Sequence, residues 1–139
     1  MKYALKTTLA CLSSAVAMTF GSVSAFAVNP NSNPAGPCGT INGQITVSSS
    51  TPRLVTVWSW TTPGYSVPST ITVSADVDSY STGELVYSMY NSNNDSRSAT
   101  AEHQHALFIN YHVSAFGAHT ATKNGQGYGC YTSKTNFVV

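Results

Sequence analysis

Four histidines lie close together in the second half of the chain, and histidine is the side chain best suited to metal binding and proton transfer near neutral pH. They are His103, His105, His112 and His119. On an extended strand, His103 and His105 would project from one face about 7 Å apart, and His119 could join them from a neighbouring strand. This trio predicts a zinc or copper site. The competing interpretation, which we favour, is that the histidines are polar strand and turn residues and that the protein has no cofactor.

Two tryptophans at alternate positions form a second candidate site. Trp58 and Trp60 are two residues apart, so on a strand both indoles project from one side. Together with Tyr65 they predict an aromatic surface that stacks on sugar rings or anchors a protein partner. The alternative is that the indoles form the centre of a small core. Val55 and Val57 on the opposite side favour a central strand with at least one tryptophan buried.

Acidic residues and hydrolytic motifs give weaker signals. Asp76, Asp78 and Glu84 could hold Ca²⁺ through oxygen ligands, but they do not follow the EF-hand spacing, so we expect a solvated strand end. The chain contains no G-x-S-x-G, H-E-x-x-H, P-loop or dinucleotide-binding fingerprint. The sequence therefore predicts a protein that is not an enzyme, with no catalytic residue, although spacing alone does not reveal a triad.

The first 27 residues have the composition of a secretory signal peptide. Lys2 and Lys6 precede an apolar stretch over residues 7–23, and Ala25-Phe26-Ala27 matches the A-x-A pattern that signal peptidase recognises. We expect cleavage after Ala27 and a secreted or periplasmic mature protein that begins at Val28. No later apolar run is long enough for a transmembrane helix.

The charge of the expected mature chain excludes two kinds of partner. Without Lys2 and Lys6, four of the six basic residues remain against five acidic ones, a formal charge of about −1. Nucleic-acid-binding and polybasic membrane-binding surfaces both need clustered Lys and Arg, so neither is expected. Charged residues make up 8% of the chain, and serine, threonine and asparagine replace them at the surface.

Cys38 and Cys130 are the cysteines that remain after the expected cleavage, because Cys11 lies in the leader. In an oxidising compartment two such residues usually pair, and their spacing is not that of a C-x-x-C motif. The sequence therefore predicts a disulfide between Cys38 and Cys130, which would stabilise the domain by about 4–5 kcal/mol. Free thiols, or a bond to another chain, are the alternative.

Alternation with period two dominates the chain after residue 37. Apolar residues alternate over 41–47, 54–60, 71–77, 85–89 and 107–113, and shorter strands are expected near 119–122, 129–133 and 136–139. Turn residues lie between these stretches, including 79–83, 91–95, Gly117 and Asn124-Gly125. The pattern predicts an all-β fold, a small antiparallel β-sandwich of about seven strands with immunoglobulin-like or jelly-roll-like topology. It would form one domain over 38–139, after a flexible N-terminal arm at 28–37.

One short stretch resembles a known family. Tyr87-Ser88-Met89-Tyr90 followed by Ser98-Ala99-Thr100 is similar to the Y-S-x-Y…S-A-T stretch of lactococcin 972-type bacteriocins. Those are small secreted β-sandwich proteins that act on growing bacterial cells. The chain departs from the family at 91–97, where the family's histidines and lysine are missing, and the family has no such disulfide. The resemblance implies a sandwich fold and an antibacterial function.

Three classes of function agree with these features. The first, which we favour, is a secreted, non-enzymatic binding or adhesion module that contacts an extracellular glycan or protein through Trp58, Trp60 and Tyr65. The second is a structural subunit of an extracellular fibre or surface layer, in which the arm and the chain end would exchange strands between copies of a homo-oligomer. The third is a small antibacterial or cytolytic toxin.

Overall fold

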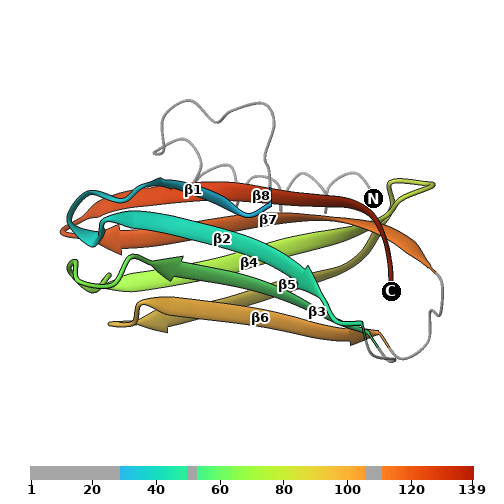
Figure 1. Cartoon of the computed structure of the whole chain (residues 1–139), viewed down its shortest axis with the longest axis horizontal. Coiled ribbons are helices and arrows are strands. Elements are labelled where there is room, and N and C mark those ends of the chain that lie inside the picture. Colours follow the sequence, from blue (N-terminus) through green and yellow to red (C-terminus); the bar gives the residue numbers. More distant parts are fainter. Residues whose placement is uncertain (1–28, 50–52, 106–110) are drawn as a thin grey trace, which may run out of the picture.

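The computed structural model describes residues 29–49, 53–105 and 111–139, which form two antiparallel sheets packed face to face (Figure 1). Sheet A has the strand order β1-β2-β3-β6, and sheet B has the order β5-β4-β7-β8. The elements are β1 Asn31–Pro34, the 3-10 helix η1 Gly36–Cys38, β2 Thr40–Val47, β3 Arg53–Thr61, β4 Thr70–Ser79, β5 Leu85–Asn94, β6 Ser98–His105, β7 His112–Lys123 and β8 Gln126–Val138. The expected β-sandwich is confirmed, with eight strands in the described part of the chain.

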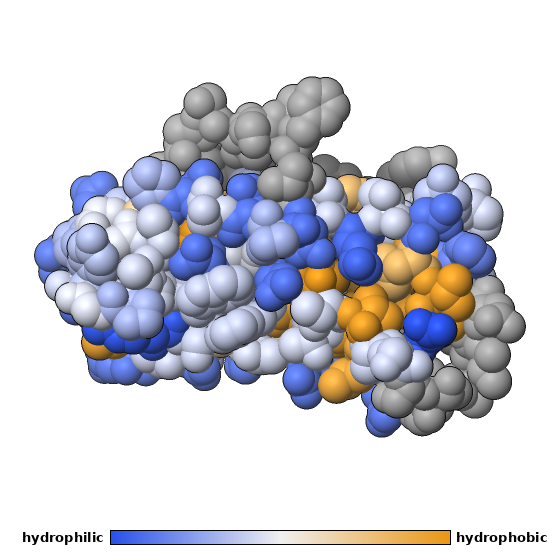
Figure 2. All heavy atoms as spheres, in the orientation of Figure 1, coloured by the Kyte–Doolittle hydropathy of each residue, from blue (hydrophilic) through white to orange (hydrophobic). Residues whose placement is uncertain are grey.

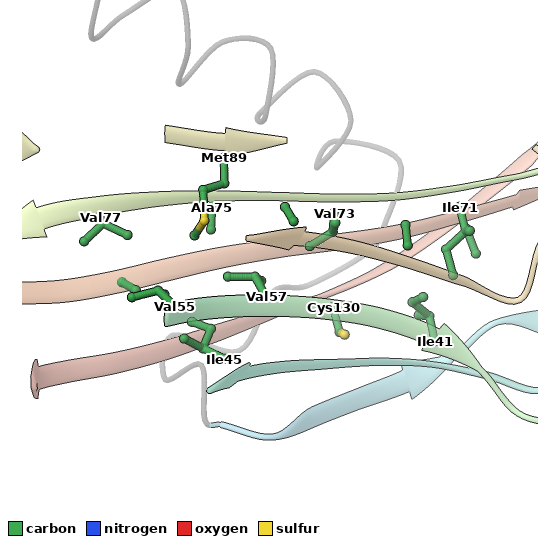
Figure 3. Close-up of a cluster of buried hydrophobic side chains, with 14 of the residues drawn as sticks. Ile41, Ile45, Val55, Val57, Ile71, Val73, Ala75, Val77, Met89 and Cys130 are labelled. Carbon is green, nitrogen blue, oxygen red and sulfur yellow. The ribbon is translucent and has the colours of Figure 1, made fainter. Parts of the chain in front are cut away.

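The core lies between the two sheets and follows the predicted alternation. Successive side chains of a strand point to opposite faces, so every second residue of the inner strands is buried. Fully buried apolar side chains are Ile41, Ile45, Val55, Val57, Ile71, Val73, Val77 and Val113. Figure 3 shows most of these side chains meeting between the layers. Burial of this apolar surface is the main favourable contribution to folding, at roughly 25 cal/mol per Å².

The hairpin between β7 and β8 confirms one predicted turn and corrects another. Asn124 and Gly125 have φ angles of 53° and 75°, as a two-residue type I′ turn requires. The strands that this turn joins are longer than expected, because the three short strands predicted after residue 118 merge into β7 and β8. Gly117, expected at a turn, lies inside β7, where a Cβ would come within 2.6 Å of Thr132 Oγ1.

Asparagine side chains connect the edge of sheet A to the edge of sheet B. In Asn31-Ser32-Asn33 of β1, the Nδ2 atom of Asn31 donates to the carbonyl oxygen of Tyr131 at 2.7 Å. Two residues further on, Nδ2 of Asn33 donates to the carbonyl oxygen of Gly129 at 2.8 Å. Both acceptors belong to β8, so these bonds close one side of the sandwich.

The same three-residue motif closes the opposite side. In Asn91-Ser92-Asn93 of β5, the two Nδ2 atoms donate to the carbonyl oxygens of Thr100 and Ser98 on β6, at 2.7 and 2.8 Å. In each motif, Oδ1 of the first asparagine accepts from the N–H of the following serine, at 2.9 Å in β1 and 2.8 Å in β5. We call these two sets of contacts the Asn-Ser-Asn seams. They engage backbone groups of edge strands, which are otherwise templates for another chain.

The segment predicted as a flexible arm is tied to the sandwich. β1 pairs with β2, and the carboxamide of Asn29 bonds to both the N–H and the carbonyl oxygen of Ile45, each at 2.7 Å. Residues 91–94, predicted within a turn, likewise belong to a strand, the end of β5. In both places asparagine forms bonds between sheets, whereas sequence patterns associate it with turns.

The predicted disulfide between Cys38 and Cys130 is wrong, because both residues are free, buried thiols. The thiol of Cys130 donates to the carbonyl oxygen of Asn31 at 3.7 Å. Cys38 lies in η1, which follows Pro34 at the other end of β1. Cys130 thus lies beside β1 and Cys38 lies in the turn after β1, and the two sulfur atoms are not within bonding distance of each other.

Several expectations fall on other parts of the chain. The leader at 1–27 and most of the strand expected at 107–113 lie outside the described residues, and β7 begins at His112. Within the described ranges, no helix is long and apolar enough to cross a membrane.

Hydrophilic and intermediate side chains cover most of the face seen in Figure 2, and hydrophobic ones gather toward the end where the C-terminus lies.

Candidate ligand-binding surface

Trp58 and Trp60 lie on the outer face of sheet A. β3 is bonded to β2 on one side and β6 on the other, so its predicted central position is confirmed. Val55, Val57 and Ser59 face the core, and the even-numbered residues between them face outward. Trp58 is 41% exposed and Trp60 is half-buried. The expectation that at least one tryptophan belongs to the core is therefore wrong.

The two indoles stack on each other. Their ring centroids are 4.3 Å apart and their planes are inclined by 29°, a geometry that contributes about 0.5–1.5 kcal/mol beyond the burial of area. Stacking occupies one face of each ring. What remains for a ligand is the unstacked faces and the outward edges of the rings, mainly those of the more exposed Trp58, so the pair forms a single compact contact rather than two coplanar platforms.

Uncharged polar side chains flank the stacked pair on both neighbouring strands. The flanking residues are Gln44 and Thr100 in the row of Trp58, and Asn42 and Ser98 in the row of Trp60. Directly opposed residues of antiparallel strands have Cβ atoms about 4.5–5.5 Å apart. The indoles therefore have carboxamides on the β2 side and hydroxyls on the β6 side. Asn42 Nδ2 also donates to the carbonyl oxygen of Trp60 at 3.1 Å, which orients this carboxamide.

Tyr65 lies in the loop after β3, beyond the end that carries Trp60, and its side chain is 55% exposed. The guanidinium of Arg97 holds this loop by donating to the carbonyl oxygens of Thr62, at 3.2 Å, and Tyr65. The ring covers Gly39, where a Cβ would come within 2.7 Å of it. Among the described residues Tyr65 belongs to no ring stack. The structure thus places it as a separate exposed ring at the Trp60 end of β3.

A buried polar network crosses the core beneath the tryptophan pair. Ser59 lies between the two tryptophans in sequence but faces inward, and its Oγ is 2.8 Å from Nδ1 of His119 on β7. Nε2 of the same imidazole is 2.8 Å from Oγ1 of Thr132 on β8. Gly43 on β2 leaves room for the ring, because a Cβ there would come within 2.1 Å of it. These side chains connect sheet A to sheet B.

The partners of His119 fix its tautomer. Ser59 Oγ donates its proton to the carbonyl oxygen of Thr72 at 2.9 Å, so it accepts from Nδ1–H of the imidazole. Nε2 then accepts from the hydroxyl of Thr132. Burial lowers the pKa of His119 to about 4, so the ring is neutral at pH 7 and satisfied at both nitrogens.

The contact between Ser59 and His119 has the distance of a nucleophile and its base, but both side chains are 0% exposed. A nucleophile must reach its substrate. The serine proton is directed at a backbone carbonyl, and the second imidazole nitrogen bonds to a threonine hydroxyl. This pair therefore serves packing between the sheets.

The residues predicted as metal ligands have separate environments. His119 is bonded at both ring nitrogens in the core, and His103 on β6 stacks on Tyr87, with ring centroids 3.9 Å apart. His112 Nδ1 lies 2.7 Å from Oδ1 of Asn136. The side chain of His105 is outside the described residues. Where side chains are described, no three His, Cys, Asp or Glu residues form a metal-binding group.

The outer face of sheet B carries features that sequence reasoning missed. Tyr90 is 69% exposed and Phe116 is 48% exposed, and they lie opposite Ser74 and Asp76 of β4. Asp76, considered above as a Ca²⁺ ligand, accepts a hydrogen bond from Ser88 Oγ at 2.6 Å. The alternation of residues along β5 and β7 could have predicted the outward position of the two aromatic residues. The buried network was harder to predict from the sequence, because only two glycines at inward positions of predicted strands pointed to it.

Comparison with protein families and with curated proteins found no match. No protein-family model matches the chain, and no curated protein matches it in sequence. The short resemblance to lactococcin 972-type bacteriocins therefore gains no support from a family match.

Proposed function

We propose that this protein is a secreted, non-enzymatic module that binds an extracellular glycan through the outer face of sheet A. Trp58 is the main contact, with Trp60 and Tyr65 beside it. The observation that carries the proposal is the outward position of the stacked indoles on a central strand. A small domain gains most by burying tryptophan, so an indole left 41% exposed, while alanines occupy core positions, favours a binding role.

The surroundings of the indoles support a sugar ligand. A pyranose ring has an apolar face bordered by hydroxyl groups, so it needs an aromatic surface together with donors and acceptors of hydrogen bonds. The flanking carboxamides of Asn42 and Gln44 and hydroxyls of Ser98 and Thr100 supply both kinds of group. The leader, with its A-x-A pattern, supports export, and the proposal includes cleavage after Ala27.

Titration of the purified protein against a polysaccharide panel tests this proposal. The chain has two tryptophans, and both lie in the stacked pair, so tryptophan fluorescence reports on this surface alone. We expect Trp58→Ala to weaken binding about 30-fold, the effect of losing a central aromatic contact of about 2 kcal/mol, and Tyr65→Ala to weaken it less. Affinity electrophoresis gives the affinities of variants that lack an indole.

Tyr90→Ala is the matched control. It removes a more exposed aromatic ring from the opposite sheet, and its affinity should equal that of the unmodified protein. Circular dichroism checks that each variant is folded. Equal binding by the Trp58→Ala and Tyr90→Ala variants would refute the proposal.

A further inference from the structure

The outer face of sheet A is almost free of charge in its described part. The sheet registers place fourteen side chains on this face, most of them serine, threonine, asparagine or glutamine. Glu102 is the charged member of this set. It lies opposite Thr56, in the row next to Trp58, and accepts a hydrogen bond from Thr56 Oγ1 at 3.4 Å.

Two arginines flank this face, Arg53 before Leu54 and Arg97 before Ser98, and both are further along the strands from Trp58 than Glu102 is. Arg97 immediately precedes Ser98, the residue beside Trp60. Its guanidinium donates to the carbonyl oxygens of Thr62 and Tyr65 in the loop after β3. These bonds use two of the five N–H donors of the guanidinium and direct it toward the loop that carries Tyr65.

The charge nearest to Trp58, the main proposed contact, is therefore the carboxylate of Glu102, which does not complement a negative ligand. Like charges brought together at an interface reduce affinity, and rim charges act mainly on specificity. Hydroxyl and carboxamide groups, in contrast, bond to neutral sugar hydroxyls without any change of charge state. The neutral polar groups and the carboxylate on this face should therefore favour uncharged sugars over anionic ones.

From this arrangement we infer that the ligand is an uncharged polysaccharide and that Glu102 rejects polysaccharides bearing carboxylate or sulfate groups. The inference rests on the proposed function and adds the chemical class of its ligand. Glu102 is a specificity residue here, because neutral sugars bind through the indoles and the flanking polar groups.

Polymers that share a backbone but differ in charge test this inference. Neutral hydroxyethylcellulose is compared with carboxymethylcellulose, and neutral dextran with dextran sulfate, by affinity electrophoresis at low and high salt. We expect the neutral member of at least one pair to bind in a Trp58-dependent way, with little effect of salt. The anionic member should bind roughly fivefold more weakly at low salt, the effect of one nearby like charge.

The Glu102→Gln variant separates the possible outcomes. It should recover much of the binding of the anionic member and leave that of the neutral member unchanged. Trp58-dependent binding that is tighter for the anionic polymer, or a Glu102→Gln variant that does not change the ratio, would overturn the inference while the proposed function stands. Absence of any Trp58-dependent binding across both pairs and the polysaccharide panel would overturn the proposed function, and this inference with it.

Discussion

At the scale of single residues, burial of His119 couples stability to pH. The pKa of this imidazole is about 4 in the folded protein against an ordinary value of 6.5, so the unfolded chain binds its proton more tightly. Its contribution to stability is complete above pH 6.5 and is lost as the pH falls from 6.5 toward 4, by on the order of 3 kcal/mol. Urea unfolding over this range should show the decrease.

His119→Gln is the control for this prediction, because it removes the titrating group and keeps a polar side chain. The difference in unfolding free energy between the two proteins should vary with pH between 6.5 and 4 and be constant above. Imidazole resonances in the unmodified protein give a second readout, with a midpoint near 4 and the proton on Nδ1. A midpoint near 6.5 would contradict the buried network.

The two cysteines give another prediction at this scale. Burial raises the pKa of both thiols, that of Cys130 to about 12, so the reactive thiolate is scarce at pH 8. We expect slow alkylation of Cys130 in the native protein and complete alkylation of Cys38 and Cys130 in denaturant without reductant. Mass spectrometry of the two peptides measures this. Labelling in denaturant that appears only after reduction would demonstrate a disulfide and contradict the structure.

At the scale of elements, the Asn-Ser-Asn seams hold the two sheets together along their edges. Asn31→Asp and Asn91→Asp keep the size of the side chain but replace the Nδ2 donor with an oxygen that faces a backbone carbonyl. We expect each to destabilise the fold by about 1 kcal/mol at pH 7, because the bond is part-buried and its carbonyl acceptor loses its partner. Chemical denaturation measures the loss. Ser32→Ala, which retains the backbone N–H, is the control, and equal midpoints for all variants would argue against the seams.

Strands defined by apolar alternation could be predicted, and strands defined by contacts between sheets could not. The patterns over 41–47 and 71–77 match β2 and β4 because most of their buried residues are isoleucine or valine. Among the described side chains of β6, the buried ones are the small Ala99 and Ala101, which give a weak pattern. The asparagines of β1 and β5 have their acceptors on strands of the other sheet, so their sequence alone indicates a turn.

At the candidate site, too, the sequence reveals the alternation along a strand but not the contacts of that strand with other strands. Alternation places Trp58 and Trp60 on one face of β3, as predicted, but both faces of this strand carry apolar residues. Ser59 decides the orientation. It points inward because His119 and the Thr72 carbonyl satisfy its hydroxyl, and those partners come from β7 and β4. The disulfide prediction failed for a related reason, because sequence spacing does not give a distance in space.

At the scale of the whole molecule, the arrangement of the chain ends bears on how copies could associate. A fibre subunit that exchanges strands needs an end that can leave the sandwich. Val139 is buried, and its backbone exchanges hydrogen bonds of 3.0 and 3.3 Å with that of Tyr111. β1 is held by β2 and by a seam. Strand exchange would have to break these contacts in one copy and form them again with the next.

The most direct test of the account is to map the ligand-contacting surface by NMR, titrating ¹⁵N-labelled protein with short oligomers of the neutral polysaccharide that it binds best. We predict that the largest shifts occur at the indole N–H groups of Trp58 and Trp60 and at the side-chain amides of Asn42 and Gln44. The amides of Tyr90 and Phe116 on sheet B should stay in place. Shifts confined to sheet B, or binding that leaves both indole signals unchanged, would contradict the claim that the stacked tryptophans form the binding surface.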